Sequence, residues 1–261
     1  MGSLVGDLSV EFDGLVLSGS VAHGSHLQSV KQGRYEPFTT RFFKRLMGPG
    51  KLVLDIGAYV GYYTLLAAKA GAKVYSFEPN PASFKYIVRN AQANGFQERV
   101  IAVPKAVSDK NAMVSFFLSR DQSSLFHRSS GFEEVVVECA RLDDLLSNEE
   151  VVDFIKMDVE GAELHALQGM EQTLARAGDG LCMVVECNPR KLRSAGSSAG
   201  ALLDRLKALG FIVRGVDRRR GSYYVPDASK LDSGHSVNPY SVNLFCARWD
   251  EVFAAGGPQL T

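Results

Sequence analysis

Lys51-Leu-Val-Leu-Asp-Ile-Gly-Ala-Tyr-Val-Gly61 is the stretch that decides the fold. Its first six residues form a short, mainly apolar run, which is typical of a strand buried on both faces of a parallel sheet. The glycines at positions 57 and 61 permit a turn with positive φ, and helical periodicity follows over residues 62–70. This order predicts the first unit of an α/β sheet, with a helix N-terminus free to face an anion or a carboxylate.

The rest of the chain continues the alternation of apolar runs and helical patterns. Further strands are predicted over residues 72–77, 100–107, 152–157 and 181–186, and helices over residues 81–94, 163–177 and 201–209. The 81–94 helix has Asn80 as its expected cap and Gly95 as its stop. An extended pair at 113–118 and 134–139 is joined by a polar connection.

The two ends of the chain depart from this alternation. The last two predicted strands, 211–216 and 241–248, have no helix between them, which indicates an antiparallel hairpin closing an otherwise parallel sheet. The first 50 residues hold a hairpin (8–17) and a helix (36–47). No linker follows them, so residues 1–50 are interpreted as an extension of the domain formed by residues 51–261.

Composition excludes several classes of protein. The 261 residues are 46% hydrophobic and carry 29 basic and 29 acidic side chains, so no global basic field exists to hold nucleic acid. Apolar runs fall short of the roughly 20 residues that a membrane span requires. Four cysteines without a CxxC pair are interpreted as reduced thiols, which favours a cytoplasmic location.

The glycine turn argues against two common nucleotide sites. A dinucleotide site requires G-x-G-x-x-G, but counting from Gly57 the next two glycine positions are Tyr59 and Tyr62. A P-loop fails because no Gly-Lys-Ser/Thr follows. The remaining pattern, D-x-G-x-x-x-G from Asp55, suits a nucleoside whose polar tail is an amino acid.

Two further turns extend this crevice, because ligands of open parallel sheets bind beyond the carboxyl ends of the strands. Glu78 ends the second strand 23 positions after Asp55, where a carboxylate can accept hydrogen bonds from both ribose hydroxyls. Its alternative role is to complement the dipole of the helix that follows. The turn at residues 105–109, which includes Ala106, is expected to lie against the base.

Three carboxylates surround the end of a later strand, at Asp158, Glu160 and Glu163. Acids in a first helical turn stabilise it by roughly 0.3 to 1 kcal/mol, which accounts for the two glutamates without any function. Asp158 stands at the strand end itself, and clustered carboxylates can act as a general base or hold a divalent cation.

These turns in this order resemble the FkbM-type family of S-adenosylmethionine-dependent methyltransferases, over residues 35–189. The matching segments are Tyr35-Glu-Pro37, Val53-Leu-Asp-Ile-Gly-Ala-Tyr-Val-Gly-Tyr-Tyr-Thr64, Phe77-Glu-Pro-Asn80, Asn90 with Asn94, Ser123-Ser-Leu125, Arg141-Leu-Asp-Asp144 and Ile155-Lys-Met-Asp-Val-Glu-Gly-Ala-Glu163. The resemblance implies a Rossmann-like, doubly wound seven-stranded sheet of order 3-2-1-4-5-7-6 with strand 7 antiparallel.

The resemblance also implies where S-adenosylmethionine binds. The residues predicted to bind the cofactor are Glu36, Asp55, Gly57, Tyr59, Gly61, Thr64, Glu78, Pro79, Asn80, Ala106 and Asp158. Tyr59 stands where the family usually has Asn, which adopts a left-handed backbone more readily. That departure predicts either a loop that bends differently or an altered cofactor pocket.

The predicted activity is O-methylation of a hydroxyl group on a small molecule, a sugar or a secondary metabolite. The candidates for the general base are Asp158, Glu186 and His127. A divalent metal is conceivable at these acids but is not predicted. Two alternatives stay open, an RNA methyltransferase and a non-enzymatic nucleoside-binding protein. The sequence makes no prediction of oligomeric state.

Overall fold

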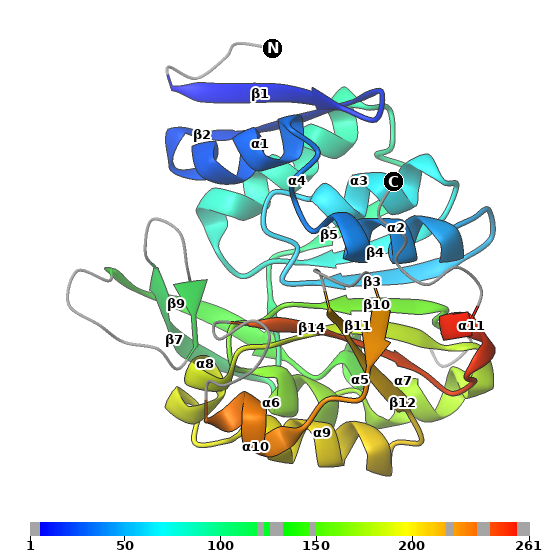
Figure 1. The fold of residues 1–261 in the computed structure, drawn as a ribbon. Coiled ribbons are helices and arrows are strands. Elements are labelled where there is room, and N and C mark those ends of the chain that lie inside the picture. Colours follow the sequence, from blue (N-terminus) through cyan, green and yellow to red (C-terminus); the bar gives the residue numbers. More distant parts are fainter. Residues whose placement is uncertain are drawn as a thin grey trace.

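The computed structural model describes residues 6–118, 123–125, 133–146, 150–217, 222–233 and 241–254. Within these residues the main sheet has eight strands in the order β13-β12-β14-β11-β10-β3-β4-β5 (Figure 1). Its strands are β3 (Leu52–Ile56), β4 (Lys73–Phe77), β5 (Val100–Val103), β10 (Phe154–Met157), β11 (Cys182–Cys187), β12 (Ile212–Asp217), β13 (Ser222–Tyr224) and β14 (Val242–Ala247).

This order confirms the predicted topology. In chain order β3, β4, β5, β10, β11, β12 and β14 are strands 1 to 7, so the sheet runs 3-2-1-4-5-7-6. Strand β14 is antiparallel to both β11 and β12, while the other neighbours from β5 to β11 are parallel. Strand β13 and the helix α10 (Ala228–Asp232) were not predicted; both lie in the polar region between β12 and β14 that was expected to be a loop without a helix, where β13 pairs with β12.

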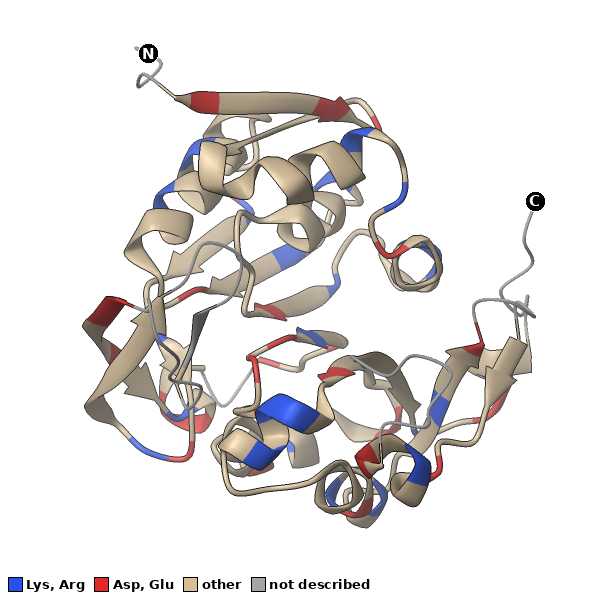
Figure 2. Cartoon of the chain, turned by 60° about the vertical axis from the view of Figure 1, so that its left-hand side comes forward, with Lys and Arg blue, Asp and Glu red and all other residues tan. Residues whose placement is uncertain are grey.

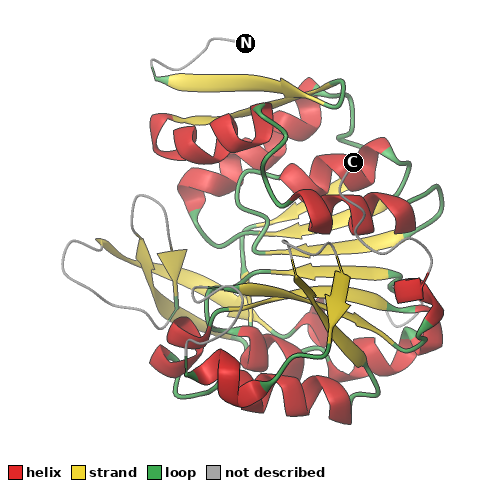
Figure 3. Cartoon of the chain, viewed as in Figure 1, coloured by secondary structure: helices red, strands yellow, loops and turns green. Residues whose placement is uncertain are grey.

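Helices cover both faces of the main sheet (Figure 3). Their bounds are α1 (Gly24–Lys31), α2 (Pro37–Leu46), α3 (Tyr62–Lys69), α4 (Pro81–Ala93), α5 (Leu142–Leu145), α6 (Glu163–Gln168), α7 (Glu171–Arg176), α8 (Pro189–Ser194), α9 (Ala199–Ala208), α10 (Ala228–Asp232) and α11 (Glu251–Ala254), with 3-10 turns at Val21–His23 and Gly178–Gly180.

Each face of the sheet has its own hydrophobic core because strand side chains alternate between faces. Leu52, Leu54 and Ile56 of β3 belong to the core beneath α6, α7 and α9, whereas Val53 belongs to the core that includes α2, α3 and α4. Leu17 and other N-terminal residues join the second core. We refer to that second face as the N-terminal face of the sheet.

The N-terminal hairpin consists of β1 (Asp7–Phe12) and β2 (Leu15–Ser20), and it is wider than the predicted 8–17. Its turn is Asp13-Gly14, both with positive φ, as a two-residue hairpin requires. Asn90 of α4 exchanges hydrogen bonds with the backbone of Ser18, and Asn94 does the same with Val16. These two asparagines therefore attach the hairpin to α4.

A second sheet has the order β6-β9-β7-β8 and occupies the connection between β5 and β10. Its strands are β6 (Ala106–Val107), β7 (Ala112–Leu118), β8 (Ser123–Ser124) and β9 (Glu133–Ala140). The predicted extended pair is confirmed as β7 and β9, which run antiparallel. The predicted single strand 100–107 was wrong, because it breaks at Pro104, which has no N–H for the ladder.

The predicted helix 163–177 was also wrong as one element, since it divides into α6 and α7 at Gly169. A Cβ at this glycine would lie 1.8 Å from the carbonyl oxygen of Ser108, so the chain passes closely against the second sheet there. The Gly169 carbonyl instead accepts a hydrogen bond from the Asp143 N–H.

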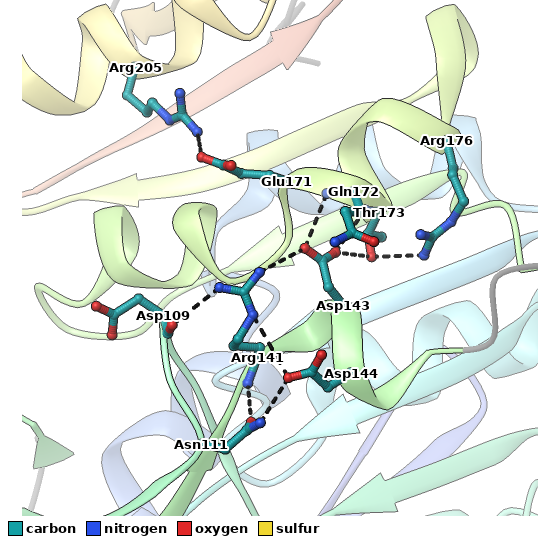
Figure 4. Close-up of polar contacts among 10 residues, drawn as sticks. All are labelled: Asp109, Asn111, Arg141, Asp143, Asp144, Glu171, Gln172, Thr173, Arg176 and Arg205. Atoms are coloured by element: carbon teal, nitrogen blue, oxygen red, sulfur yellow. Dashed lines mark hydrogen bonds and ion pairs between the residues drawn. The ribbon is translucent and has the colours of Figure 1, made fainter.

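The Arg141–Asp144 segment of the resemblance has a structural role (Figure 4). The buried Asp143 carboxylate accepts hydrogen bonds from the N–H groups of Gln172 and Thr173, and so caps the first turn of α7. The Arg141 N–H donates to Asn111, whose amide donates to Asp144. These contacts join α7 to the base of the β7–β9 hairpin.

Two remaining expectations concern the cysteines and the membrane. All four cysteines are buried and free, as predicted for reduced thiols. Among the described residues, none of the helices combines the length and the apolar character required to cross a membrane.

Candidate functional site

A cavity of about 740 Å³ opens at the carboxyl ends of β3, β4 and β10. Its size lies in the range of pockets that take a drug-sized ligand, roughly 300 to 1,000 Å³. The predicted cofactor residues that line it are Asp55, Gly57, Tyr59, Glu78, Pro79, Asn80, Ala106 and Asp158. The structure therefore brings most of the predicted residues to one crevice.

The loop after β3 has the backbone that its glycines predicted. Gly57, Tyr59 and Gly61 have φ values of 79°, 55° and 92°. A Cβ at Gly57 would lie 1.9 Å from the carbonyl oxygen of Asp158, so this position requires glycine. Tyr59 adopts the left-handed backbone conformation at the position where the family usually has Asn, so the tyrosine does not make the loop bend differently. The change instead brings a tyrosine ring to the cavity.

Asp55 ends β3 as a buried carboxylate, 2% exposed. The Thr64 hydroxyl donates to Asp55 Oδ2 over 2.6 Å and also lies 2.6 Å from the Ser76 hydroxyl. Burial raises the pKa of Asp55 to about 6, against the lowering effect of Thr64 and the Lys156 ammonium. Thr64, in the first turn of α3, thus holds the Asp55 carboxylate in place through its hydroxyl group.

Glu78 is likewise buried at the end of β4. Its Oε2 accepts a hydrogen bond from the Tyr59 N–H and its Oε1 from the Asn80 N–H, each at 2.8 Å. Burial raises the pKa of Glu78 to about 7 despite these two bonds. Each oxygen keeps a further lone pair for a hydroxyl donor. Asn80 caps α4 as predicted, by accepting from the Ala82 N–H.

Three charged residues are expected on one face of the sheet, because side chains alternate between the two faces along β3, β10 and β11. Val53, Phe154 and Val184 point to the N-terminal face, so the residues two positions later, Asp55, Lys156 and Glu186, are expected on that face too. Lys156 is Asp55's register partner on the neighbouring strand.

Lys156 is buried, 3% exposed, and its Nζ lies 3.6 Å from Asp158 Oδ2. The same ammonium lies 5.4 Å from the centre of the Tyr63 ring, and the Tyr63 hydroxyl donates to Glu36 over 2.6 Å. Burial lowers the pKa of Lys156, but the surrounding carboxylates, Asp158 first, outweigh burial and raise that pKa to about 12. Lys156 is therefore a buried cation among acids.

Glu186 lies close to Asp158. Burial raises the pKa of the Glu186 carboxyl well above its usual value, and the charge of Asp158 raises it further. Oxygen atoms of Asp158, Glu160 and Glu186 lie within 4.8 Å of one another, close enough to hold a divalent cation. However, Lys156 pairs with Asp158 and Lys191 pairs with Glu160, so two ammonium groups already supply positive charge to this cluster.

The other predicted site residues have different positions. Glu36, Gly61, Thr64 and Glu186 are not among the described residues that line the cavity. His127 lies outside the described residues. Ala106 lines the cavity together with Val107, Phe116, Leu118 and Leu125, so the second sheet forms an apolar end of the crevice, where the base was expected.

Sequence reasoning missed the wall that faces these loops, which includes His23, His26 and Tyr35. The His23 Nδ1 accepts from the Ser20 N–H, and its Nε2 lies 3.3 Å from the Ser83 hydroxyl. No motif around the two histidines signalled a site, and the Tyr35-Glu-Pro37 match had pointed to Glu36 rather than to Tyr35. Lys156 was also missed, although a lysine inside the buried strand Phe154–Met157 was a usable signal.

The sheet order, the glycine turn after β3 and the acid after β4 define the class of Rossmann-like methyltransferase folds. Comparison with known proteins agrees. A solved Streptococcus mutans protein described as a methyltransferase, in complex with SAH, matches with a TM-score of 0.51 at 11% identity, covering 81% of this chain and 96% of that one.

Sequence comparison gives the family. The model of the methyltransferase FkbM domain matches residues 55–213. The hexuronic acid methyltransferase AglP of Haloferax volcanii is 25% identical over 176 residues, covering 66% of this chain and 72% of AglP. The 2-O-methyltransferase NoeI of Sinorhizobium fredii is 26% identical over 194 residues, covering 65% and 77%. The chain belongs to the FkbM methyltransferase family and is an S-adenosylmethionine-dependent enzyme.

Proposed function

We propose that this enzyme methylates a hydroxyl group of a small molecule, and that the sheet-edge loops hold the cofactor. The observation that carries the proposal is that Asp55, Gly57, Glu78 and Asp158 all line one cavity. One relative supports a hydroxyl acceptor, since NoeI is a 2-O-methyltransferase, and AglP, which is named for hexuronic acid, supports a sugar as the acceptor.

The described residues fit S-adenosylmethionine along this crevice. Gly57 and Tyr59 open the backbone for its amino-acid part, Glu78 accepts from its ribose, and Ala106 with the apolar end of the cavity takes its base. Glu36 and Thr64 do not line the cavity themselves. Glu36 accepts a hydrogen bond from Tyr63 and Thr64 donates one to Asp55, and each would thereby orient a residue that does line it. When bound, the cofactor supplies an electrophilic methyl group on a sulfonium.

Asp158 is the proposed base for the acceptor hydroxyl. It lines the cavity, whereas Glu186 stands behind it with a raised pKa that favours its neutral form. A protonated Glu186 can donate to Asp158, and the Lys156 ammonium lies 3.6 Å from Asp158 Oδ2. Because Lys156 and Lys191 already pair with two of the three clustered acids, we propose no metal. Positioning is expected to supply most of the rate enhancement.

An RNA acceptor finds no support among the described residues. The charged lining of the cavity consists of Asp55, Glu78, Glu133, Asp158 and Glu160 against Lys105 and Lys156. Basic and acidic residues are mixed over the surrounding elements (Figure 2). Phosphate groups would meet more acids than bases here. The Arg218–Arg220 run, which had kept this alternative open, lies outside the described residues.

Calorimetric titration with S-adenosylhomocysteine tests the cofactor site. We expect the wild-type protein to bind, and Glu78→Gln to weaken binding by about 10- to 100-fold, because a charged hydrogen bond contributes roughly 1.5 to 3 kcal/mol. Since the pKa of Glu78 is about 7, wild-type affinity should increase from pH 6 to pH 8 as the carboxylate ionises. The Gln variant should lack this increase. No binding to the wild-type protein would refute the proposal.

A further inference from the structure

The segment before residue 55 lies outside the matched family domain and yet forms part of the cavity. Its 3-10 turn and α1 bring His23 and His26 to the cavity, and Tyr35 precedes α2. We define the aromatic wall as His26, Tyr35, Tyr59 and Tyr62. Three of its four residues, His26, Tyr35 and Tyr62, line the cavity outside the set proposed to hold the cofactor.

His26 is the centre of the aromatic wall. Its ring makes edge-to-face contacts with Tyr35, Tyr59 and Tyr62, with ring centres 4.4, 5.1 and 6.3 Å apart. Tyr35 and Tyr62 contact each other at 5.1 Å. His26, Tyr35 and Tyr59 remain partly exposed, while Tyr62 is buried. All four residues line the cavity, so a ligand can reach this cluster.

The aromatic wall carries no positive charge at neutral pH. Burial lowers the pKa of His26 to about 4, and His23 lowers it further. Burial also lowers the pKa of His23, and the Lys85 charge adds to this effect. Both imidazoles are then neutral, so they cannot hold a carboxylate or a phosphate as imidazolium groups would.

Acids stand beside the aromatic wall. Asp158 and Glu160 line the same cavity. Burial raises the pKa of the Tyr35 hydroxyl, and the negative charges of Glu36 and Asp158 raise it further. Carboxylates accept hydrogen bonds from hydroxyl groups and repel other anions. The negative faces of aromatic rings attract the C–H face of a sugar ring.

We propose that the acceptor is a neutral, ring-shaped polyol, a sugar without carboxylate or phosphate, which stacks on the aromatic wall and directs hydroxyl groups to Asp158 and Glu160. This inference rests on the proposed function. It separates this enzyme from its Haloferax relative, which is named for a hexuronic acid.

Two probes with the same ring test the charge preference: methyl β-glucopyranoside and methyl β-glucopyranosiduronic acid. Saturation-transfer NMR on protein saturated with S-adenosylhomocysteine measures the affinity for each, and the galactose and mannose pairs are measured alongside. We expect the neutral member of at least one pair to bind at least about ten-fold more tightly, because like-charge contacts cost several kcal/mol. Equal binding, preference for the uronic acids, or binding of no glycoside would overturn the inference.

The variants separate this inference from the proposed function. His26→Ala should lose about ten-fold or more in glycoside affinity and keep its affinity for S-adenosylhomocysteine, and His26→Phe should restore the glycoside affinity. Equal loss of both ligands in His26→Ala would assign the aromatic wall to the cofactor. Failure of the wild-type protein to bind S-adenosylhomocysteine would instead refute the proposed function.

Glu160→Gln tests the acids. It should improve binding of the uronic acids by about three- to ten-fold, because one repulsive charge is removed. The matched control is Glu171→Gln, which removes another ion-paired glutamate, bonded to Arg205 and outside the lining of the cavity. No change in Glu160→Gln, or the same change in the control, would contradict the role given to this acid.

Discussion

The two walls of the cavity are built in different ways. The sheet-edge loops are held by backbone hydrogen bonds, such as those from the Gly57 N–H to Phe77 and from the Tyr59 N–H to Glu78. The facing wall, from His23 to Tyr35, is held largely by ring contacts among side chains. Backbone geometry restricts which residues can occupy the first wall. Side chains of the second wall can be replaced without changing the backbone. This difference suits a fixed cofactor and a variable acceptor.

Gly57→Ala gives the largest expected effect and tests the wall formed by the sheet-edge loops, which we call the rigid wall. The new Cβ would lie 1.9 Å from the Asp158 carbonyl oxygen, at a φ of 79°. We expect a loss of about 3 kcal/mol or more in the free energy of unfolding, from overpacking and left-handed strain together. Urea unfolding measures this loss. Any variant that remains folded should bind S-adenosylhomocysteine poorly.

The matched control is Gly95→Ala. Gly95 has a similar φ of 73° with nothing within 4 Å of a Cβ. It should lose about 1 to 2 kcal/mol, from left-handed strain alone. If both variants lost the same free energy, the close approach at Asp158 would not explain why position 57 holds glycine.

Two titratable groups whose pKa values are shifted by burial, Glu163 beside the loop after β10 and His26 in the aromatic wall, predict opposite responses to pH. Burial raises the pKa of Glu163 from 4.5 to about 7, so its contribution to stability is complete below about pH 4.5 and is lost as pH rises through 7. Burial lowers the pKa of His26 from 6.5 to about 4, so its contribution is complete above about pH 6.5 and is lost as pH falls through 4.

Glu163→Gln and His26→Phe isolate these two responses. The Glu163 variant should lose less stability than wild type between pH 5 and 8, by up to about 3 kcal/mol. The His26 variant should lose less than wild type between pH 6.5 and 4, by a similar amount or less. Urea unfolding at several pH values measures both, and slopes unchanged from wild type in either variant would remove that group from the explanation.

The sequence predicted the rigid wall and not the other, for a physical reason. Asp55, Gly57, Glu78 and Asp158 end predictable strands, and topology alone brings strand ends to one edge of a sheet. His26 reaches the cavity through tertiary packing of α1, a short helix that sequence periodicity did not reveal.

The same limit explains one of the errors in the fold. The seven-strand order followed from the resemblance, and the antiparallel final hairpin also followed from connection length; both were right. The break at Pro104 has a local cause, the missing N–H, whereas the break at Gly169 depends on its close approach to Ser108 beside the second sheet. Such long-range contacts override the local pattern of a strand or a helix.

Tyr59→Asn gives the smallest expected effect and tests the one residue that belongs to both walls. Its backbone N–H bonds Glu78, and its ring contacts His23 and His26 at 4.9 and 5.1 Å. Asn should relieve some left-handed strain and lose ring contacts of about 0.5 to 1.5 kcal/mol, so the net change in stability should stay within about 1 kcal/mol. Affinity for S-adenosylhomocysteine should stay within about three-fold, because the N–H is retained. Tyr59→Phe keeps the ring and serves as the control. A large loss of affinity in the Asn variant alone would mean that the tyrosine ring, and not only its backbone, serves the cofactor, and the two walls would then not divide the ligands between them.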